Sequence, residues 1–132
     1  FMTETSDFVI GRHKTSNKHY DLVLGINGAV RHWIVPRDIP KKYGEKRIAI
    51  EEGRHAGFPQ KGKDGQAAED SWGKGIWEIW DEGSYEVEAS SSIKLVIRPS
   101  GDRFRGRYLL LVPGWGRWTG KRLWIIEKIK ER

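Results

Sequence analysis

The stretch KHYDLVLGING, residues 18–28, alternates polar and apolar side chains and ends in an Asn-Gly pair. Alternation with a period of two is typical of a β-strand with one buried face, and Asn-Gly tolerates the backbone angles of a tight hairpin turn. The residues expected on the buried face are Tyr20, Leu22, Leu24 and Ile26. His19, Asp21 and Val23 then project from the outer face, because successive side chains of a strand point to opposite sides. The stretch therefore predicts a hairpin that places an imidazole and a carboxylate side by side on its outer surface.

The rest of the chain repeats this period of two and has almost no segment at helical spacing. Turn residues separate the segments at Gly83, at residues 99–102 and at residues 113–114. Besides the strand at 20–26, strands are expected at residues 8–10, 29–36, 46–52, 74–81, 84–89, 92–98, 106–112 and 121–129. Because closure hides the edges of short strands, we predict an all-β fold, a small closed antiparallel β-barrel of about eight strands.

Length and composition limit the class of protein. The chain has 132 residues, no cysteine and a net charge of +6 from 24 Lys and Arg against 18 Asp and Glu. We expect a single domain over residues 1–132, with a short disordered N-terminus over residues 1–7. Absence of cysteine excludes disulfides and thiolate chemistry, so a metal needs histidine and carboxylate ligands. The basic charge suits a polyanionic partner. Without a bilayer-spanning apolar run or a signal-peptide pattern, we expect a cytoplasmic monomer that binds no membrane.

Two features are candidates for function. His13, His19 and Asp21 form the pattern HxxxxxHxD, and two histidines with a carboxylate suit Mn²⁺, Fe²⁺ or Zn²⁺. On spacing alone, surface histidines in a local hydrogen bond explain the pattern at least as well. Residues 57–75 are Gly-rich and polar, and a loop of this length in a compact domain is typically functional or mobile.

Segments throughout the chain carry a family resemblance. They are FVIGRH (8–13), HYD (19–21), WIVPR (33–37), KRIAIEEGRH (46–55), WGKGIWEIWDEGSYE (72–86), RGRYLLL (105–111) and LWIIEK (123–128). In these segments the chain resembles the 3′-phosphoesterase domain of bacterial DNA ligase D, which also occurs as a stand-alone protein. The resemblance implies a β-barrel with an active-site groove on its outer surface. It also implies a Mn²⁺-dependent enzyme that removes a 3′-terminal ribonucleoside and then the remaining 3′-phosphate during break repair.

The resemblance assigns histidines and an aspartate to the site. The family's essential residues of these types fall on His13, His19, Asp21 and His55. We assign His13, His19 and Asp21 to the metal, and His55 to the phosphate as a hydrogen-bond donor or general acid. The alternative, with His55 as a ligand and His19 facing the phosphate, stays open. The implied cofactor is Mn²⁺, for which Zn²⁺, Co²⁺ or Cd²⁺ can substitute.

The resemblance also assigns cations and aromatic residues to the substrate. Its phosphate-contacting positions fall on Arg37 and Arg47. Arg47 is expected on the polar face of residues 46–52, opposite Ile48 and Ile50, where it points toward the groove. Further DNA contacts are expected from Arg12, Arg54, Trp72 and Trp118. The implied substrates are DNA or RNA-DNA primer-template 3′ ends, and the implied partners are a ligase and a polymerase of an end-joining system.

The chain departs from the family pattern at several positions. Val23 replaces a usual arginine, Arg37 replaces a lysine, and a tyrosine usual after the last histidine is missing. Because the arm before residue 8 is short, we expect removal of the ribonucleoside to be impaired. We expect His32, Arg12 or Arg54 to compensate as anion donors.

Two other functions fit the same sequence. One is a non-catalytic nucleic-acid-binding barrel, which its basic charge and loop tryptophans favour. The other is a docking module of a repair ligase complex. We rank the enzyme first because metal-type and phosphate-type side chains recur at the family's spacing.

Overall fold

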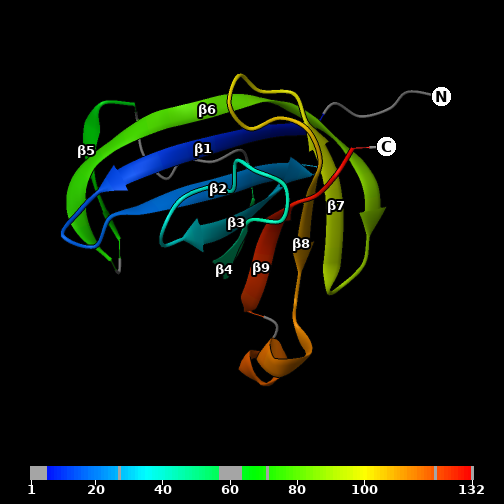
Figure 1. Ribbon diagram of the computed structural model, residues 1–132. Coiled ribbons are helices and arrows are strands. Elements are labelled where there is room, and N and C mark those ends of the chain that lie inside the picture. Colours follow the sequence, from blue (N-terminus) through cyan, green and yellow to red (C-terminus); the bar gives the residue numbers. More distant parts are fainter. Residues whose placement is uncertain (1–5, 27, 57–63, 71, 121, 132) are drawn as a thin grey trace.

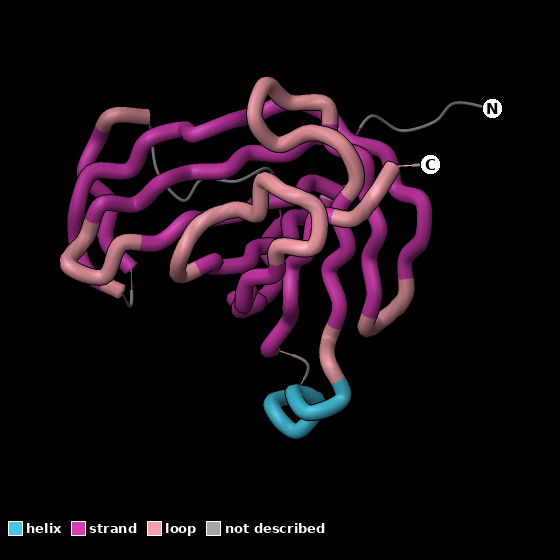
Figure 2. Tube along the Cα trace, in the orientation of Figure 1, coloured by secondary structure: helices cyan, strands magenta, loops and turns pink. Residues whose placement is uncertain are grey.

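The computed structural model (Figure 1) describes residues 6–26, 28–56, 64–70, 72–120 and 122–131, with residues 53–56 described by their backbone alone. The strands are β1 (Ser6–Lys14), β2 (His19–Ile26), β3 (Ala29–Val35), β4 (Lys46–Ala56), β5 (Gln66–Asp70), β6 (Gly73–Ser90), β7 (Lys94–Pro99), β8 (Tyr108–Leu111) and β9 (Leu123–Lys128), and a 3₁₀ helix, η1, spans Gly114–Thr119. Figure 2 shows that strands form nearly the whole wall of the molecule and that η1 projects beyond β8 and β9. In the described part of the chain, no helix has the length and apolar character needed to cross a membrane.

The strands form one antiparallel sheet that closes on itself. Their order is β1-β2-β3-β4-β9-β8-β7-β6-β5, and an additional β1–β6 pairing closes the barrel. Among the strands of the described residues, only β5 stays outside the closed ring, paired with β6. The predicted small closed antiparallel β-barrel is confirmed, since closure removes all strand edges except that of the added strand.

The hairpin predicted for residues 20–36 forms, with β2 and β3 as its strands. Gly28 has a φ of 77°, which glycine adopts without the steric cost of a Cβ. Leu22 pairs with Trp33 across the hairpin, and both side chains are fully buried. β3 ends at Val35, directly before Pro36. The local alternation of apolar residues therefore determines which face of this hairpin lines the barrel.

Three local predictions are wrong. β1 begins at Ser6, so residues 6 and 7, expected to be disordered, pair with β6. Gly83 does not make a turn: β6 runs through it, and a Cβ there would lie 3.2 Å from the Phe8 ring. Glycine thus serves close packing inside a strand. The predicted loop at residues 57–75 contains β5 and the start of β6, while residues 57–63 lie outside the described part.

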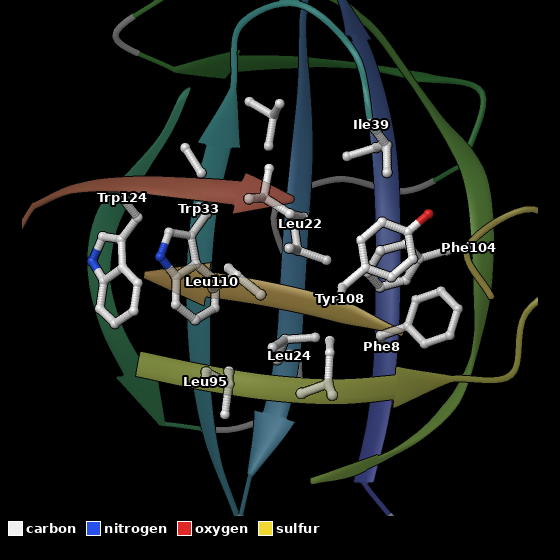
Figure 3. Close-up of a cluster of buried hydrophobic side chains, with 14 of the residues drawn as sticks. Phe8, Leu22, Leu24, Trp33, Ile39, Leu95, Phe104, Tyr108, Leu110 and Trp124 are labelled. Atoms are coloured by element: carbon white, nitrogen blue, oxygen red, sulfur yellow. The ribbon is translucent and has the colours of Figure 1, made fainter. Parts of the chain in front are cut away.

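Large apolar side chains fill the interior of the barrel (Figure 3). Trp33 and Trp124 pack edge to face with ring centroids 5.6 Å apart, and Phe104 packs on Tyr108 with centroids 4.4 Å apart. Burial of each such side chain contributes roughly 1.5–3 kcal/mol relative to exposure. This core fixes the positions of the strands, and thereby the register of the residues on the outer face.

A buried carboxylate ties the segment after β7 to the barrel. Asp81 is 8% exposed and accepts hydrogen bonds from the backbone N–H groups of Glu82, Asp102, Arg103 and Phe104 at 2.7–3.3 Å. An ionised carboxylate satisfies several backbone donors at once. This arrangement holds Phe104 in the core.

Because two tyrosines are buried, we expect the free energy of unfolding to fall at high pH. The Tyr85 hydroxyl donates to the Gly25 carbonyl at 3.0 Å, and that of Tyr108 donates to the Pro40 carbonyl at 2.7 Å. Burial raises the pKa of Tyr85 to about 12 and also raises the pKa of Tyr108. The unfolded chain releases these protons near pH 10, before the folded protein does, so the free energy of unfolding falls as the pH rises above about 10.

Urea unfolding at pH 9 and pH 11 measures this effect, with phenolate absorbance reporting the ionisation. The Tyr85→Phe variant is expected to lose less stability between the two pH values, because one of the linked protons is absent. Titration of every phenol in a single step near the ordinary pKa of about 10 would contradict the prediction.

Candidate metal centre

The predicted metal ligands lie at the end of the β1–β2 hairpin. His13 and His19 are paired in the ladder, with ring centroids 5.0 Å apart, and Asp21 follows on the same face. This face points away from the core residues Leu22 and Leu24, as predicted. The expectation of a surface position is wrong, because His13 and Asp21 are 0% exposed and His19 is 1% exposed. Val23, expected on the same surface, is also buried at 1%.

Aromatic side chains from the β5–β6 region pack against this face. The Trp77 indole donates from Nε1 to Asp21 Oδ2 at 3.1 Å, and the Trp72 ring lies 5.2 Å from the His19 ring. Gly11 allows this packing, since a Cβ at that position would overlap the Trp77 indole. The β1–β6 pairing therefore encloses a face that the alternation of β2 alone predicts to be open.

Asp70, at the end of β5, joins the three predicted residues. Its Oδ2 lies 3.2 Å from His13 Nδ1 and 3.1 Å from His19 Nε2. The four side chains each offer one ligand atom, and these atoms all lie within 4.8 Å of one another. Asp70 was not among the ligands predicted from the sequence. Its only signal was its place in the stretch singled out as a functional loop, because the contact depends on how a distant hairpin folds.

Backbone carbonyls set the tautomers of both histidines. His13 Nε2 donates to the carbonyls of Ala68 at 2.8 Å and Gly75 at 3.1 Å, and His19 Nδ1 donates to that of Asn17 at 2.9 Å. A carbonyl only accepts, so each ring carries its N–H on that side. In the neutral rings, the lone pairs of His13 Nδ1 and His19 Nε2 consequently face the carboxylates.

The Asp21 carboxylate is oriented by its own partners. His32 Nε2 lies 2.7 Å from Oδ1, and Oδ2 accepts the Trp77 N–H and lies 3.6 Å from His19 Nε2. His32 is 7% exposed, so the structure directs it to Asp21, although the sequence suggested it as an anion donor. Hydrogen bonds of this kind fix the orientation of metal-binding carboxylates.

The residues present fit a divalent cation. Neutral nitrogens and carboxylate oxygens are the ligands of Mn²⁺, Fe²⁺ and Zn²⁺, and the set contains no sulfur. Ligand atoms on one ion with bonds of about 2.1 Å lie roughly 3 Å apart. Three of the nitrogen–oxygen separations here are 3.1–3.6 Å, and the whole set lies within 4.8 Å. Buried acceptors that face one another repel unless a cation or a proton lies between them.

Two of the predicted DNA-binding arginines meet at a basic pocket. Arg37 and Arg12 are exposed and line a pocket of about 410 Å³ together with Lys14, Lys18, His19 and Tyr20. Arg12 and Tyr20 are paired in the ladder and alternate with His13 and His19, so their side chains leave the opposite face of the hairpin. Glu78 accepts from Lys14 at 2.7 Å, which lowers the pKa of this carboxyl. The cations thus lie next to the histidines in sequence but across the hairpin from the ligand atoms.

The predicted orientation of Arg47 is wrong. Ala49 is 0% exposed and belongs to the core, whereas Ile48 is 39% exposed, so Arg47 lies on the core face of β4. There Arg47 Nε donates to Asp38 at 2.5 Å. The structure therefore does not bring Arg47 to the face that carries Asp21.

The remaining predicted residues are placed only in part. The side chains of His55 and Arg54 lie outside the described residues, and their backbones pair with Val30 and Arg31 in β3. Trp118 is 84% exposed on η1, apart from the β5–β6 hairpin that carries Trp72 (Figure 1).

Comparisons with known proteins agree with the geometry. A model of the family described as the DNA ligase D 3′-phosphoesterase domain matches residues 11–112. The chain is 29% identical over 120 residues to the multifunctional non-homologous end joining DNA repair protein LigD of Mycobacterium tuberculosis. It is 28% identical over 127 residues to the corresponding LigD of Mycolicibacterium smegmatis. Each match covers 88% of this chain and 16% of the relative, so the chain spans a small part of the relatives' length. The chain belongs to the DNA ligase D 3′-phosphoesterase domain family.

Proposed function

We propose that this protein is a metal-dependent hydrolase that heals DNA 3′ ends, removing a 3′-terminal ribonucleoside, a 3′-phosphate or both to leave a 3′-hydroxyl. The observation that carries the proposal is the buried convergence of His13 Nδ1, His19 Nε2 and carboxylate oxygens, with both ring N–H groups held by carbonyls on the far side. Membership in a phosphoesterase family supports hydrolysis of a phosphate ester as the reaction.

The names of the relatives support a role in break repair. They are multifunctional non-homologous end joining proteins, and the matched region is a small part of each. We therefore propose DNA or RNA-DNA primer-template 3′ ends as substrates, in the cytoplasm, with a ligase and a polymerase of an end-joining system as partners.

The chain's own residues supply positioning and charge. His13, His19 and Asp21 would hold Mn²⁺, and such an ion polarises a phosphoryl oxygen and neutralises developing negative charge. His32 and Trp77 keep the Asp21 carboxylate in place during the reaction. Arg12 and Arg37 attract the sugar-phosphate backbone to this end of the barrel.

The residues that contact the phosphate are part of the proposal. We place Arg37 ahead of Arg47, because Arg37 is exposed and lines the basic pocket together with His19, whereas Arg47 is bonded to Asp38 on the core face of β4. His55 is proposed to donate a hydrogen bond or a proton to the leaving oxygen. Mn²⁺ affinity distinguishes the roles of His55 and His19. Replacement of a metal ligand weakens Mn²⁺ binding, whereas replacement of a proton donor does not.

A non-catalytic nucleic-acid-binding barrel is the second candidate. The pocket lined by Arg12, Lys14, Lys18 and Arg37 and the 84% exposed Trp118 favour it, since cations and aromatic rings hold single strands without chemistry. Turnover distinguishes this candidate from the enzyme.

One assay tests the proposed function. A primer-template with a single 3′-terminal ribonucleotide is incubated with Mn²⁺, Mg²⁺, Zn²⁺, Co²⁺, Cd²⁺ or a chelator, and 3′-phosphate and 3′-hydroxyl products are resolved. We expect product with Mn²⁺ and none with the chelator. Binding of the primer-template without product under any metal would support the second candidate.

A further inference from the structure

Asp70 reaches the metal centre from outside the barrel. It ends β5, which among the described strands is the one outside the closed ring, and its side chain is 13% exposed. Its two oxygens have different partners. Oδ1 accepts the backbone N–H of Trp72 at 2.8 Å, which closes the turn into β6, and Oδ2 points at His13 and His19.

The same hairpin also orients His13. Ala68 and Gly75 are paired across β5 and β6, and both of their carbonyls lie within 3.1 Å of His13 Nε2. Thr15 and Asn17 donate to the Trp72 carbonyl at 3.1 and 3.3 Å, which ties the turn to the segment between β1 and β2. The hairpin is therefore docked against the histidines on both sides of Asp70.

The position of Oδ2 favours a positive charge between this oxygen and the two rings. Oδ2 lies 3.1–3.2 Å from two ring nitrogens whose N–H groups are directed elsewhere. With both rings neutral, three acceptors meet in a largely buried site and repel one another, and a cation bound between them or a proton on one ring turns the repulsion into attraction. With Asp21, Asp70 also gives the site two negative charges, which balance a divalent ion.

We propose that Asp70 is a fourth protein ligand of the metal, supplied by the β5–β6 hairpin, so that metal binding and docking of the hairpin are coupled. The inference rests on the metal centre of the proposed function and extends it from three residues on one hairpin to four residues on two.

An Asp70→Asn variant separates the metal role from the turn role. Asparagine keeps an acceptor for the Trp72 N–H, but it removes the charge and one of the two oxygens. Glu69→Gln is the matched control, because Glu69 is the adjacent carboxylate, exposed on the other face of β5. An Asp21→Asn variant tests whether the predicted ligands bind Mn²⁺ at all.

The experiment is a Mn²⁺ titration of the full chain, with free Mn²⁺ measured by electron paramagnetic resonance. We expect the Kd for Mn²⁺ to rise at least about 10-fold in Asp70→Asn, since even partners of a ligand cost 10–100-fold. The Kd of Glu69→Gln should change by less than about twofold, as for a surface substitution.

Other outcomes distinguish the inference from the proposed function. An Asp70→Asn protein with an unchanged or lower Kd, while Asp21→Asn loses binding, overturns the inference and leaves the proposed function intact. A native chain that binds no Mn²⁺ overturns both.

A second measurement does not depend on the folding of a variant. In the native chain, Mn²⁺ is expected to slow hydrogen exchange of the β5 and β6 amides in residues 66–79. Equal exchange with and without saturating Mn²⁺ would overturn the coupling.

Discussion

The Asp21→Asn protein is expected to lose more than about 100-fold of the Mn²⁺-dependent cleavage rate at DNA 3′ ends, beyond the loss that an outer partner of a ligand causes. Asp21 is fully buried, accepts the Trp77 N–H and lies 2.7 Å from His32. Asparagine occupies the same volume, but it removes the negative charge that a divalent ion needs at this position. Single-turnover cleavage of the 3′-ribonucleotide primer-template, with Mn²⁺ affinity measured in parallel, checks this prediction.

Two variants serve as controls for the cleavage rate of Asp21→Asn. Asp102→Asn changes an exposed carboxylate and should keep the native rate. His32→Gln weakens the orientation of Asp21 without removing a ligand, and should cost about 10–100-fold. Thermal unfolding shows whether each variant is folded at the assay temperature. A folded Asp21→Asn protein with native activity would exclude Asp21 from the metal centre.

The Gly75→Ala protein is expected to bind Mn²⁺ at least about 10-fold more weakly and to lose roughly 1–3 kcal/mol of stability. A Cβ on Gly75 would overlap the Lys14 carbonyl oxygen and lie 2.6 Å from the carbon of that carbonyl. Because these are backbone atoms, the start of β6 must move away from β1. That movement breaks the hydrogen bonds of His13 Nε2 to the Gly75 and Ala68 carbonyls, and it moves the Asp70 carboxylate away from the His13 and His19 rings.

Gly114→Ala is the matched control. A Cβ on Gly114 meets no described atom within 4 Å, and this glycine is not among those with positive φ. Its stability should stay within about 0.5 kcal/mol of the native value, and its Mn²⁺ affinity should be unchanged. Hydrogen exchange of residues 66–79 should accelerate in Gly75→Ala alone. Native Mn²⁺ affinity in a folded Gly75→Ala protein would show that close docking of the hairpin is dispensable for the centre.

Local pattern was sufficient for the β2–β3 hairpin, and together with the family resemblance it identified three of the four clustered side chains. Leu22 and Leu24 are in the core, and the intervening Asp21 is on the opposite face, because alternation follows directly from strand geometry. The pairing of His13 with His19 follows from the short connection between β1 and β2. These relations lie within a few residues of sequence, where spacing has geometric meaning.

Alternation predicted the wrong buried face for β4, because the size of the core side chains decides which face of this strand is buried. The alternation of Ile48 and Ile50 indicated a buried face, yet Ala49 is the buried residue and Ile48 is exposed. Ala49 pairs with Trp124, and the Trp33 and Trp124 rings already fill the interior beside it. Where two indoles occupy the core, only a small residue fits opposite them, and hydrophobicity alone does not reveal which face that is.

By itself, the sequence determined the strands of the all-β fold, the faces of its first hairpin and the donor types of the candidate metal centre, since these depend on neighbours along the chain. Closure into a barrel followed from the general cost of open strand edges. The tertiary structure alone decided that the centre is buried, that Asp70 joins it and that Arg47 lies on the other face of the sheet. Each of these depends on which remote strand packs over a surface. That choice is set by pairing and packing across the whole barrel, which no local periodicity encodes.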